Sequence, residues 1–205
     1  MRTRAILIFA ILTLALAPVA TAGAATVSSQ AVWPSASHAP YSDPRQLTYD
    51  FAHKYLAFTS PVVGSYQAGD SMSGEVNVRA ASRGTVTTVL VRRLGTARNW
   101  YVIGAIGATI SITVPLQGAT VLSPLSVRGR STAFEGVVNL ALKTSSGVVL
   151  ASATALGGSM GVMGSYRATL TFHTTDPSYA NLIVRERSAK DGGTAVASVI
   201  RLRLC

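Results

Sequence analysis

The pattern of apolar and polar residues begins with one amphipathic helix. Asp43 followed by Pro44 is typical of a helix start, and Thr59-Ser60-Pro61 of a helix end. Between them, apolar residues recur at helical spacing: Leu47, Phe51, Tyr55 and Phe58. His53 and Lys54 fall outside this stripe, so we expect them on a solvated face of the helix.

Three strand patterns follow the helix, at residues 74–80, 84–95 and 99–107. The first alternates Val with polar residues, and the other two are rich in β-branched and aromatic residues. A turn at 95–98 separates the last two. One helix and about three antiparallel strands predict a small α+β unit over residues 43–108. It is of marginal size for independent folding, so packing against a neighbour is expected.

From Ile110 onward the pattern is that of strands only. Seven are predicted, at 110–116, 120–129, 136–144, 148–156, 166–174, 180–188 and 195–204. Short strands spaced about ten residues apart, with turn residues between them, are typical of a β-sandwich. The fold class is therefore mainly β: a seven-stranded immunoglobulin-like sandwich over residues 109–205 behind the small α+β unit. The Cys…Trp…Cys signature of antibody domains is absent.

The first 42 residues lack these patterns. A secretory signal peptide is predicted at 1–24, and hence a secreted protein. It would consist of the basic MRTR, an apolar run of twelve residues, and small residues for cleavage at Ala22-Gly23-Ala24. The alternative is an uncleaved N-terminal anchor, although the run is short for a membrane span. No later segment is apolar enough to be transmembrane. Residues 25–42, rich in Ser, Ala and Pro, indicate a flexible spacer in which His38 is inert.

The charge points to anionic partners. The 18 Lys and Arg residues fall to 16 when Arg2 and Arg4 leave with the signal peptide, against 8 Asp and Glu, so the mature chain would carry +8. For an exported protein the anionic partners within reach are wall polymers, lipid headgroups and extracellular polysaccharide. Nucleic acid is not expected, because no basic block exceeds two residues. Alternatively, the charge serves solubility alone.

Arginines in two predicted strands form the candidate binding surface. Arg185 and Arg187, and likewise Arg201 and Arg203, stand two residues apart, which places each pair on one face of its strand. The alternative is that they only keep the sandwich soluble. Cys205 is the single cysteine and cannot form an internal disulfide. It is either a free thiol or a link to another chain, and the oligomeric state stays open.

One stretch resembles a catalytic motif. Gly157-Gly158-Ser159-Met160-Gly161 satisfies G-x-S-x-G, the nucleophile elbow of serine hydrolases. That elbow requires a strand before the serine and a helix after it, whereas strands are predicted on both sides of Ser159. His173 is the only histidine after Ser159, and it lies in a predicted strand. A hydrolase using Ser159 is thus the alternative to a glycine-built hairpin whose next strand has Tyr166 as its first core residue.

No other chemistry is indicated by the sequence. The carboxylates are scattered, no His, Asp and Glu group has metal-ligand spacing, and no phosphate-binding loop is present. We therefore expect no catalytic residues, no cofactor and no metal.

Several stretches of the second half resemble a known family. These are ITVPLQGATVLSPLSVRGR, STAFEGVVNLALKTSSGVVL, the GSYRATLTF run and LIVRERSAKDGG. In this order they resemble the immunoglobulin-like domain of bacterial spore-germination proteins, the Gmad family. The first half, with QAGDSMSGEVNVR, is similar to the N-terminal region of secreted actinobacterial proteins that carry this domain. The resemblance implies a non-catalytic module of the cell envelope and no particular ligand.

Together these features predict a secreted, non-enzymatic protein of the bacterial envelope. Its immunoglobulin-like domain would mediate adhesion or assembly, with an anionic cell-wall polymer or another envelope protein as partner. A regulatory or sensory role in germination or dormancy is the further alternative, which only a genetic phenotype separates from adhesion.

Overall fold

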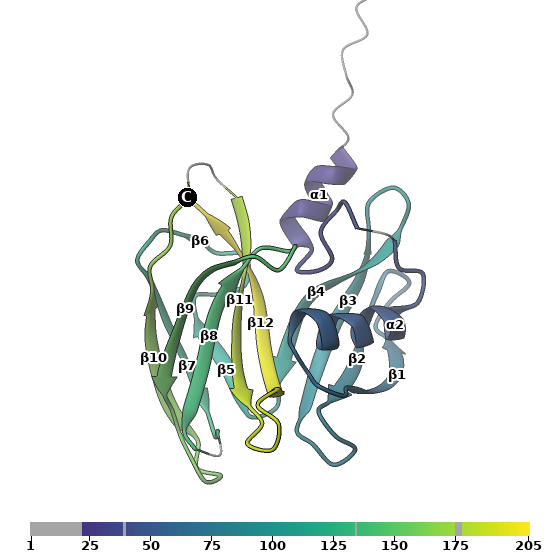
Figure 1. Ribbon diagram of the computed structural model, residues 1–205. Coiled ribbons are helices and arrows are strands. Elements are labelled where there is room, and N and C mark those ends of the chain that lie inside the picture. The colour runs from purple at the N-terminus through teal and green to yellow at the C-terminus, as the bar shows by residue number, and fades with distance from the viewer. Residues whose placement is uncertain (1–21, 39, 134, 175–177) are drawn as a thin grey trace, which may run out of the picture.

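The protein is described from a computed structural model that covers residues 22–205, except residues 39, 134 and 175–177 (Figure 1). The predicted signal peptide lies outside the described residues up to position 21. The helical elements are α1 (Ala22–Gln30), α2 (Pro44–Asp50) and the π-helix η1 (Phe51–Tyr55). The strands are β1 (Val62–Ala68), β2 (Ser73–Arg79), β3 (Val86–Leu94), β4 (Asn99–Gly107), β5 (Ile110–Val114), β6 (Thr120–Val121), β7 (Leu125–Ser131), β8 (Val137–Lys143), β9 (Val149–Leu156), β10 (Gly164–Leu170), β11 (Ser178–Arg187) and β12 (Thr194–Leu204).

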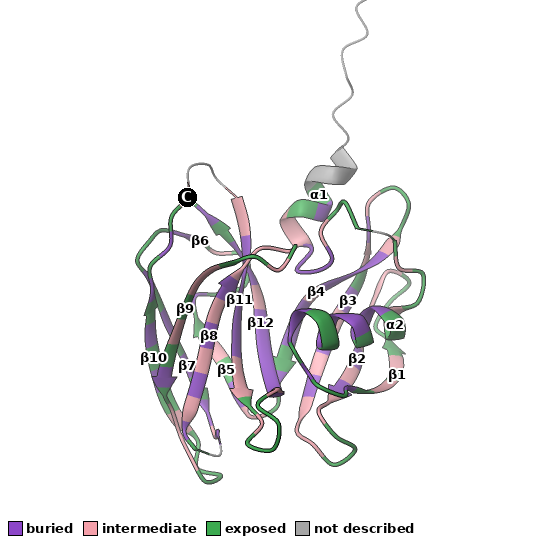
Figure 2. Cartoon of the chain, in the orientation of Figure 1, coloured by how far each residue is buried: buried purple, intermediate pink, exposed green. Residues whose placement is uncertain are grey.

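The strands form two sheets, which confirms the predicted mainly β fold class. The larger sheet has the order β1-β2-β3-β4-β12-β11-β8-β9, with β6 beside β12, and the smaller has the order β10-β7-β5. The smaller sheet packs against the β12-β11-β8-β9 part of the larger one and forms the sandwich (Figure 1). Buried and exposed residues alternate along β7 and β10 (Figure 2), as expected for sheets with one solvated face.

The sandwich core lies between the two sheets. Apolar side chains from both fill it, including Val127 and Leu170 of the smaller sheet and Leu140, Leu182 and Leu202 of the larger. The strand predicted at 120–129 is divided into β6 and β7. Pro124 lies between the two and has no N–H to give to a ladder, which explains the interruption.

The helix forms as predicted. The Asp43 carboxylate accepts a hydrogen bond of 2.8 Å from the backbone N–H of Arg45, and Pro44 occupies the first turn. The four predicted stripe residues, Leu47, Phe51, Tyr55 and Phe58, are buried. His53 and Lys54 are exposed as expected, and Lys54 forms an ion pair with Asp50.

Strand β1 was not predicted. It is an edge strand that pairs only with β2, and every one of its residues is exposed or half-buried. Its sequence, VVGSYQA, has a glycine in the middle and little alternation, so the sequence pattern does not mark it as a strand.

The two predicted units share one hydrogen-bonded sheet. Strand β4 pairs with β12 at Ala105 and Val199. On the face away from the sandwich core, Ile183, Ala197 and Val199 pack into the cluster that also holds the buried side of the helix. Strands β11 and β12 are therefore covered on both faces.

The segment expected to be a flexible spacer is instead packed against the rest of the protein. Helix α1 contributes Val27 to a cluster with Leu94 and Tyr101, and Val32 and Trp33 are buried against the helix and β4. The backbone N–H of Val32 donates to the carbonyl oxygen of Val102. The polar composition of the segment predicted disorder, but a few large apolar side chains suffice to dock it.

Candidate functional site

The four arginines predicted as a binding surface do not lie together. Arg201 is only 5 % exposed. Its guanidinium donates to the Ser145 hydroxyl at 2.8 Å, to the Asn181 side-chain oxygen at 2.8 Å and to the backbone carbonyl of Ser28 at 2.6 Å. Burial lowers the pKa of Arg201 to about 10. This arginine holds the N-terminal segment on the sandwich and does not present its charge at the surface.

Arg185 is also turned inward. It is half-buried and donates to the carbonyl oxygen of Leu56 at 3.1 Å and to the Thr194 hydroxyl at 3.2 Å. Burial lowers its pKa. Arg187 and Arg203 are exposed, but a register shift between Glu186 and Arg187 breaks the simple alternation on which the expected Arg185–Arg187 pairing depended.

The smaller sheet brings together three other arginines that the sequence analysis did not single out. Arg128 and Arg130 on β7 and Arg167 on β10 are exposed, and we call these three residues the arginine face. In the ladder, Arg128 stands opposite Arg167, and Arg130 stands opposite Ser165. The alternation in SVRGRS and SYRATL marks each arginine as outward-facing. The pairing of these strands, which begin 39 positions apart at Leu125 and Gly164, cannot be read from the sequence.

Hydroxyl side chains surround the arginine face. They come from all three strands: Ser111, Thr113, Ser126, Ser165 and Thr169, each of them exposed. Thr113 donates to the backbone carbonyl of Arg128 at 3.1 Å. Between the arginines lies a shallow depression of about 370 Å³.

The arginine face contains no acidic residue. None of the strands β5, β7 and β10 carries an Asp or Glu. The carboxylates of the described residues belong to other elements: Asp43, Asp50, Asp70, Glu75, Glu135, Glu186 and Asp191. Like charges that stand opposite one another in a ladder are destabilising. The arrangement therefore presents positive charge and hydroxyl donors to an external anion.

Tyr166 lies on the core side of this sheet, as predicted for the first core residue of its strand. It is 3 % exposed, and its hydroxyl donates to the carbonyl oxygen of Ser111 at 2.7 Å. A side-chain carbon at Gly129 would lie 2.2 Å from that hydroxyl, so only glycine fits beneath it. Burial raises the pKa of Tyr166.

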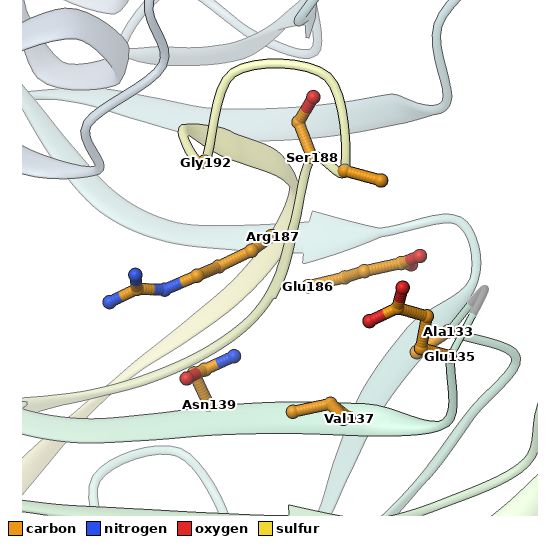
Figure 3. A pocket seen from close by; sticks show the side chains of 9 residues that line it. Ala133, Glu135, Val137, Asn139, Glu186, Arg187, Ser188 and Gly192 are labelled. Atoms are coloured by element: carbon orange, nitrogen blue, oxygen red, sulfur yellow. The ribbon is translucent and has the colours of Figure 1, made fainter.

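A second depression, of about 280 Å³, lies at one end of the sandwich (Figure 3). The carboxylates of Glu135 and Glu186 lie on one side of it, and the Arg187 guanidinium extends to the other. Within the part of the chain that the structure describes, no group of three or more His, Cys, Asp or Glu side chains could hold a metal ion.

Ser159 does not lie in a nucleophile elbow. It belongs to the loop between β9 and β10, with a strand on each side. His173 follows the far end of β10, so the seven residues of that strand separate it from Ser159 by about 23 Å, at about 3.3 Å per residue. Asp176, the carboxylate three residues after His173 in the sequence, is outside the described residues. This geometry gives Ser159 no base from His173.

Comparison with known families identifies the class of the sandwich. Residues 109–193 match the Gmad2 family model, an immunoglobulin-like domain of bacterial spore germination. The match begins just before β5 and ends just before β12, so it covers most of the sandwich and confirms the predicted resemblance there. An immunoglobulin-like domain of this kind is a non-catalytic type of fold. Searches of the curated proteins and of the solved structures found no match.

Proposed function

We propose that this protein is an exported, non-catalytic component of the bacterial cell surface whose immunoglobulin-like domain binds an anionic envelope polymer. The observation that carries the proposal is the arginine face, where Arg128, Arg130 and Arg167 share one exposed surface without a carboxylate on the same strands. The exposed Arg187 and Arg203 of the originally predicted surface add to the positive charge on other strands.

The geometry of the arginine face suits a polymer with repeated anionic groups. Arg128 and Arg130 are two residues apart on one strand, a spacing of roughly 7 Å, and Arg167 stands on the neighbouring strand, about 5 Å away between Cα atoms. Guanidinium groups bind phosphate and carboxylate oxygens through two parallel N–H bonds. A chain of phosphodiesters or uronic acids crossing the sheet would meet all three, with the surrounding hydroxyls as further donors.

A role connected with germination or dormancy is supported by the description of the matching family. Deletion of the gene, followed by measurement of recovery from dormancy, separates this role from adhesion in general. Normal recovery together with weakened attachment of the polymer would favour adhesion.

Retention on purified wall material tests the binding proposal. We expect the full chain to be retained at low salt and released as the ionic strength rises. Replacing Arg128, Arg130 and Arg167 by Gln should weaken retention roughly tenfold or more, because three charges are lost from one surface. A matched control replaces Arg83, Arg92 and Arg98, which are exposed in the other half of the chain, by Gln.

Three results would contradict the proposal. The first is retention that does not change with salt, and the second is an equal loss in the control variant. The third is retention that disappears when the wall material is treated with protease, which would identify an envelope protein as the partner.

A further inference from the structure

The loop between β9 and β10 lies at the end of the sandwich opposite the C-terminus (Figure 1). It exposes several apolar side chains. We call four residues the apolar tip: Leu156, 75 % exposed, Met160, 73 %, Val162, 69 %, and Met163, 40 %. No charged residue occurs between Leu156 and Tyr166. Exposed single apolar residues are common, but four within eight residues, from the end of β9 through the loop, are typical of an interaction site.

The base of this loop is built closely against β7 and β10. A side-chain carbon at Gly157 would lie 2.1 Å from the Ser131 hydroxyl oxygen. One at Gly158 would lie 2.1 Å from the carbonyl oxygen of Val162 and 2.2 Å from the backbone nitrogen of Gly164. Glycine is therefore required at both positions for the loop to close.

The turn at the summit holds Met160 in an uncommon conformation. The backbone N–H of Val162 donates to the carbonyl oxygen of Ser159 at 2.9 Å, and the two residues between them have φ angles of +52° at Met160 and +81° at Gly161. The left-handed region is unfavourable for a side chain such as that of Met. The backbone conformation at Met160 is therefore unfavourable in free energy, although its side chain remains exposed to solvent.

Arg130 lies close to the apolar tip, further along the smaller sheet. Ser165 pairs with Arg130, so this cation lies two strand residues from Met163, roughly 7 Å along the sheet. Arg128 and Arg167 lie two residues further, at roughly 13 Å. Apolar side chains of interfacial proteins enter a bilayer by about 5–10 Å, with cations at the level of the headgroups. Glu135 is also exposed at this end, where the backbone N–H of Gly157 donates to the carbonyl oxygen of Gly136 at 2.8 Å.

We infer that the apolar tip inserts into the surface of a lipid bilayer, with Arg130 at the depth of anionic headgroups. A stable contact with a second copy of the chain would need about 800 Å² of complementary surface on each partner, which a convex tip of four side chains does not offer. A lipid surface needs no shape complementarity. Polymer binding on the arginine face does not require the tip. The two sites share only Arg130, so a failure of the tip to respond to vesicles would leave the proposed function intact.

Fluorescence from a probe on the tip tests the inference. In the full chain carrying Cys205→Ser, a nitrobenzoxadiazole label is attached to Met160→Cys or, as a matched control, to Leu122→Cys. Leu122 is 66 % exposed and lies beyond β6, at the opposite end of the sandwich. Vesicles are made of phosphatidylcholine with or without phosphatidylglycerol. We expect the label at 160 to brighten and shift to the blue with vesicles, more strongly when phosphatidylglycerol is present, and the label at 122 to remain unchanged.

Two further substitutions separate insertion from electrostatic attraction. Val162→Ser and Arg130→Gln, each in the chain labelled at 160, should each raise the lipid concentration at half-maximal signal about fivefold. No change of either label with vesicles would overturn the inference, as would equal changes at both positions. A response to Arg130→Gln without one to Val162→Ser would mean headgroup attraction only and would overturn insertion. If the fluorescence of the label at 160 changed with protein concentration in the absence of vesicles, the tip would bind a second copy of the chain instead, and the inference would be overturned.

Discussion

Arg128 on β7 stands directly opposite Arg167 on β10, so two like charges occupy one cross-strand pair on the outer face of the smaller sheet. Such a pair is unfavourable for folding, by about 0.2–1 kcal/mol. The pair lies on the surface proposed to bind an anionic polymer. Removing one of its charges should therefore change the free energy of unfolding, which can be measured without the ligand.

We predict that replacing either arginine of this pair by Thr stabilises the protein. Arg167→Thr should raise the free energy of unfolding by about 0.5 kcal/mol at low salt, and the gain should vanish at high salt as the repulsion is screened. Urea unfolding of Arg128→Thr, Arg167→Thr and the double variant forms a double-mutant cycle. A coupling of zero, or one that does not respond to salt, would show that the two charges do not repel one another.

The buried Arg201 gives a second prediction, of opposite sign. Arg201→Met should lower the free energy of unfolding by about 2–4 kcal/mol, because the Asn181 oxygen and the Ser28 carbonyl lose their charged donor inside the protein. Arg203→Met is the matched control, since Arg203 is exposed two residues further along the strand. It should change stability by no more than about 0.5 kcal/mol. Equal effects of the two substitutions in urea unfolding would contradict the role assigned to Arg201.

These two arginine sets show how far the sequence could predict the surface. Alternation identifies which residues of a strand share a face, and in the structure Arg185 and Arg201 lie on the side of their strands away from the sandwich core. It does not tell whether that side is covered. Here the helix and the segment around Val32 cover it, and that segment had been interpreted as a spacer because of its Ser, Ala and Pro content. The contacts that bury Arg201 link residues 173 positions apart, from Ser28 to Arg201, and no local pattern encodes them.

The sandwich itself was predictable for a physical reason. Strands such as β7 and β10 alternate clearly, since each has one buried and one solvated face, and the turns of the sandwich carry Gly and Pro. Strand β1 was not predicted because it is an edge strand that buries no residue and contains a glycine, so its sequence lacks the alternation of apolar and polar residues. The arginine face escaped because strand pairing, not sequence proximity, brings Arg128 and Arg167 together.

The glycines of the G-x-S-x-G stretch give a third prediction. Gly158→Ala should destabilise the protein by about 1–3 kcal/mol or more, since the added methyl group meets backbone atoms of Val162 and Gly164. Gly161→Asn is the control: its φ is +81° but nothing lies within 4 Å of an added carbon, and Asn tolerates the left-handed region. Thermal unfolding compares the two. If Gly161→Asn were as unstable as Gly158→Ala, backbone conformation and not close contact would be the reason that glycine is required in this loop.

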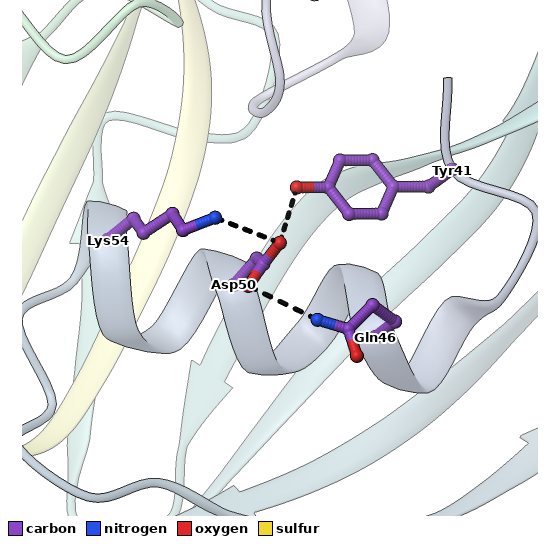
Figure 4. A network of polar contacts seen from close by, with 4 residues as sticks. All are labelled: Tyr41, Gln46, Asp50 and Lys54. Atoms are coloured by element: carbon purple, nitrogen blue, oxygen red, sulfur yellow. Dashed lines mark hydrogen bonds and ion pairs between the residues drawn. The ribbon is translucent and has the colours of Figure 1, made fainter. Parts of the chain in front are cut away.

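Asp50 couples the N-terminal segment to the helix and gives the protein a pH dependence (Figure 4). Its carboxylate accepts from the Tyr41 hydroxyl at 2.8 Å and from the Gln46 amide at 3.3 Å, and it forms an ion pair with Lys54 at 3.1 Å. Burial alone would raise the pKa of Asp50, but these partners outweigh it and hold the pKa below its ordinary value.

A carboxyl group with a lowered pKa stabilises the folded state above its pKa in the unfolded chain, about 3.9, and this contribution is lost as the pH falls through the lower, folded value. Asp50→Asn should therefore lower the free energy of unfolding by about 1–2 kcal/mol at pH 7. The difference from the parent chain should shrink below about pH 4. Tyr41→Phe, which removes one of the donors, should show part of the same effect. Urea unfolding across this pH range measures both, and a difference that stays constant down to low pH would mean that Asp50 acts through packing and not through its charge.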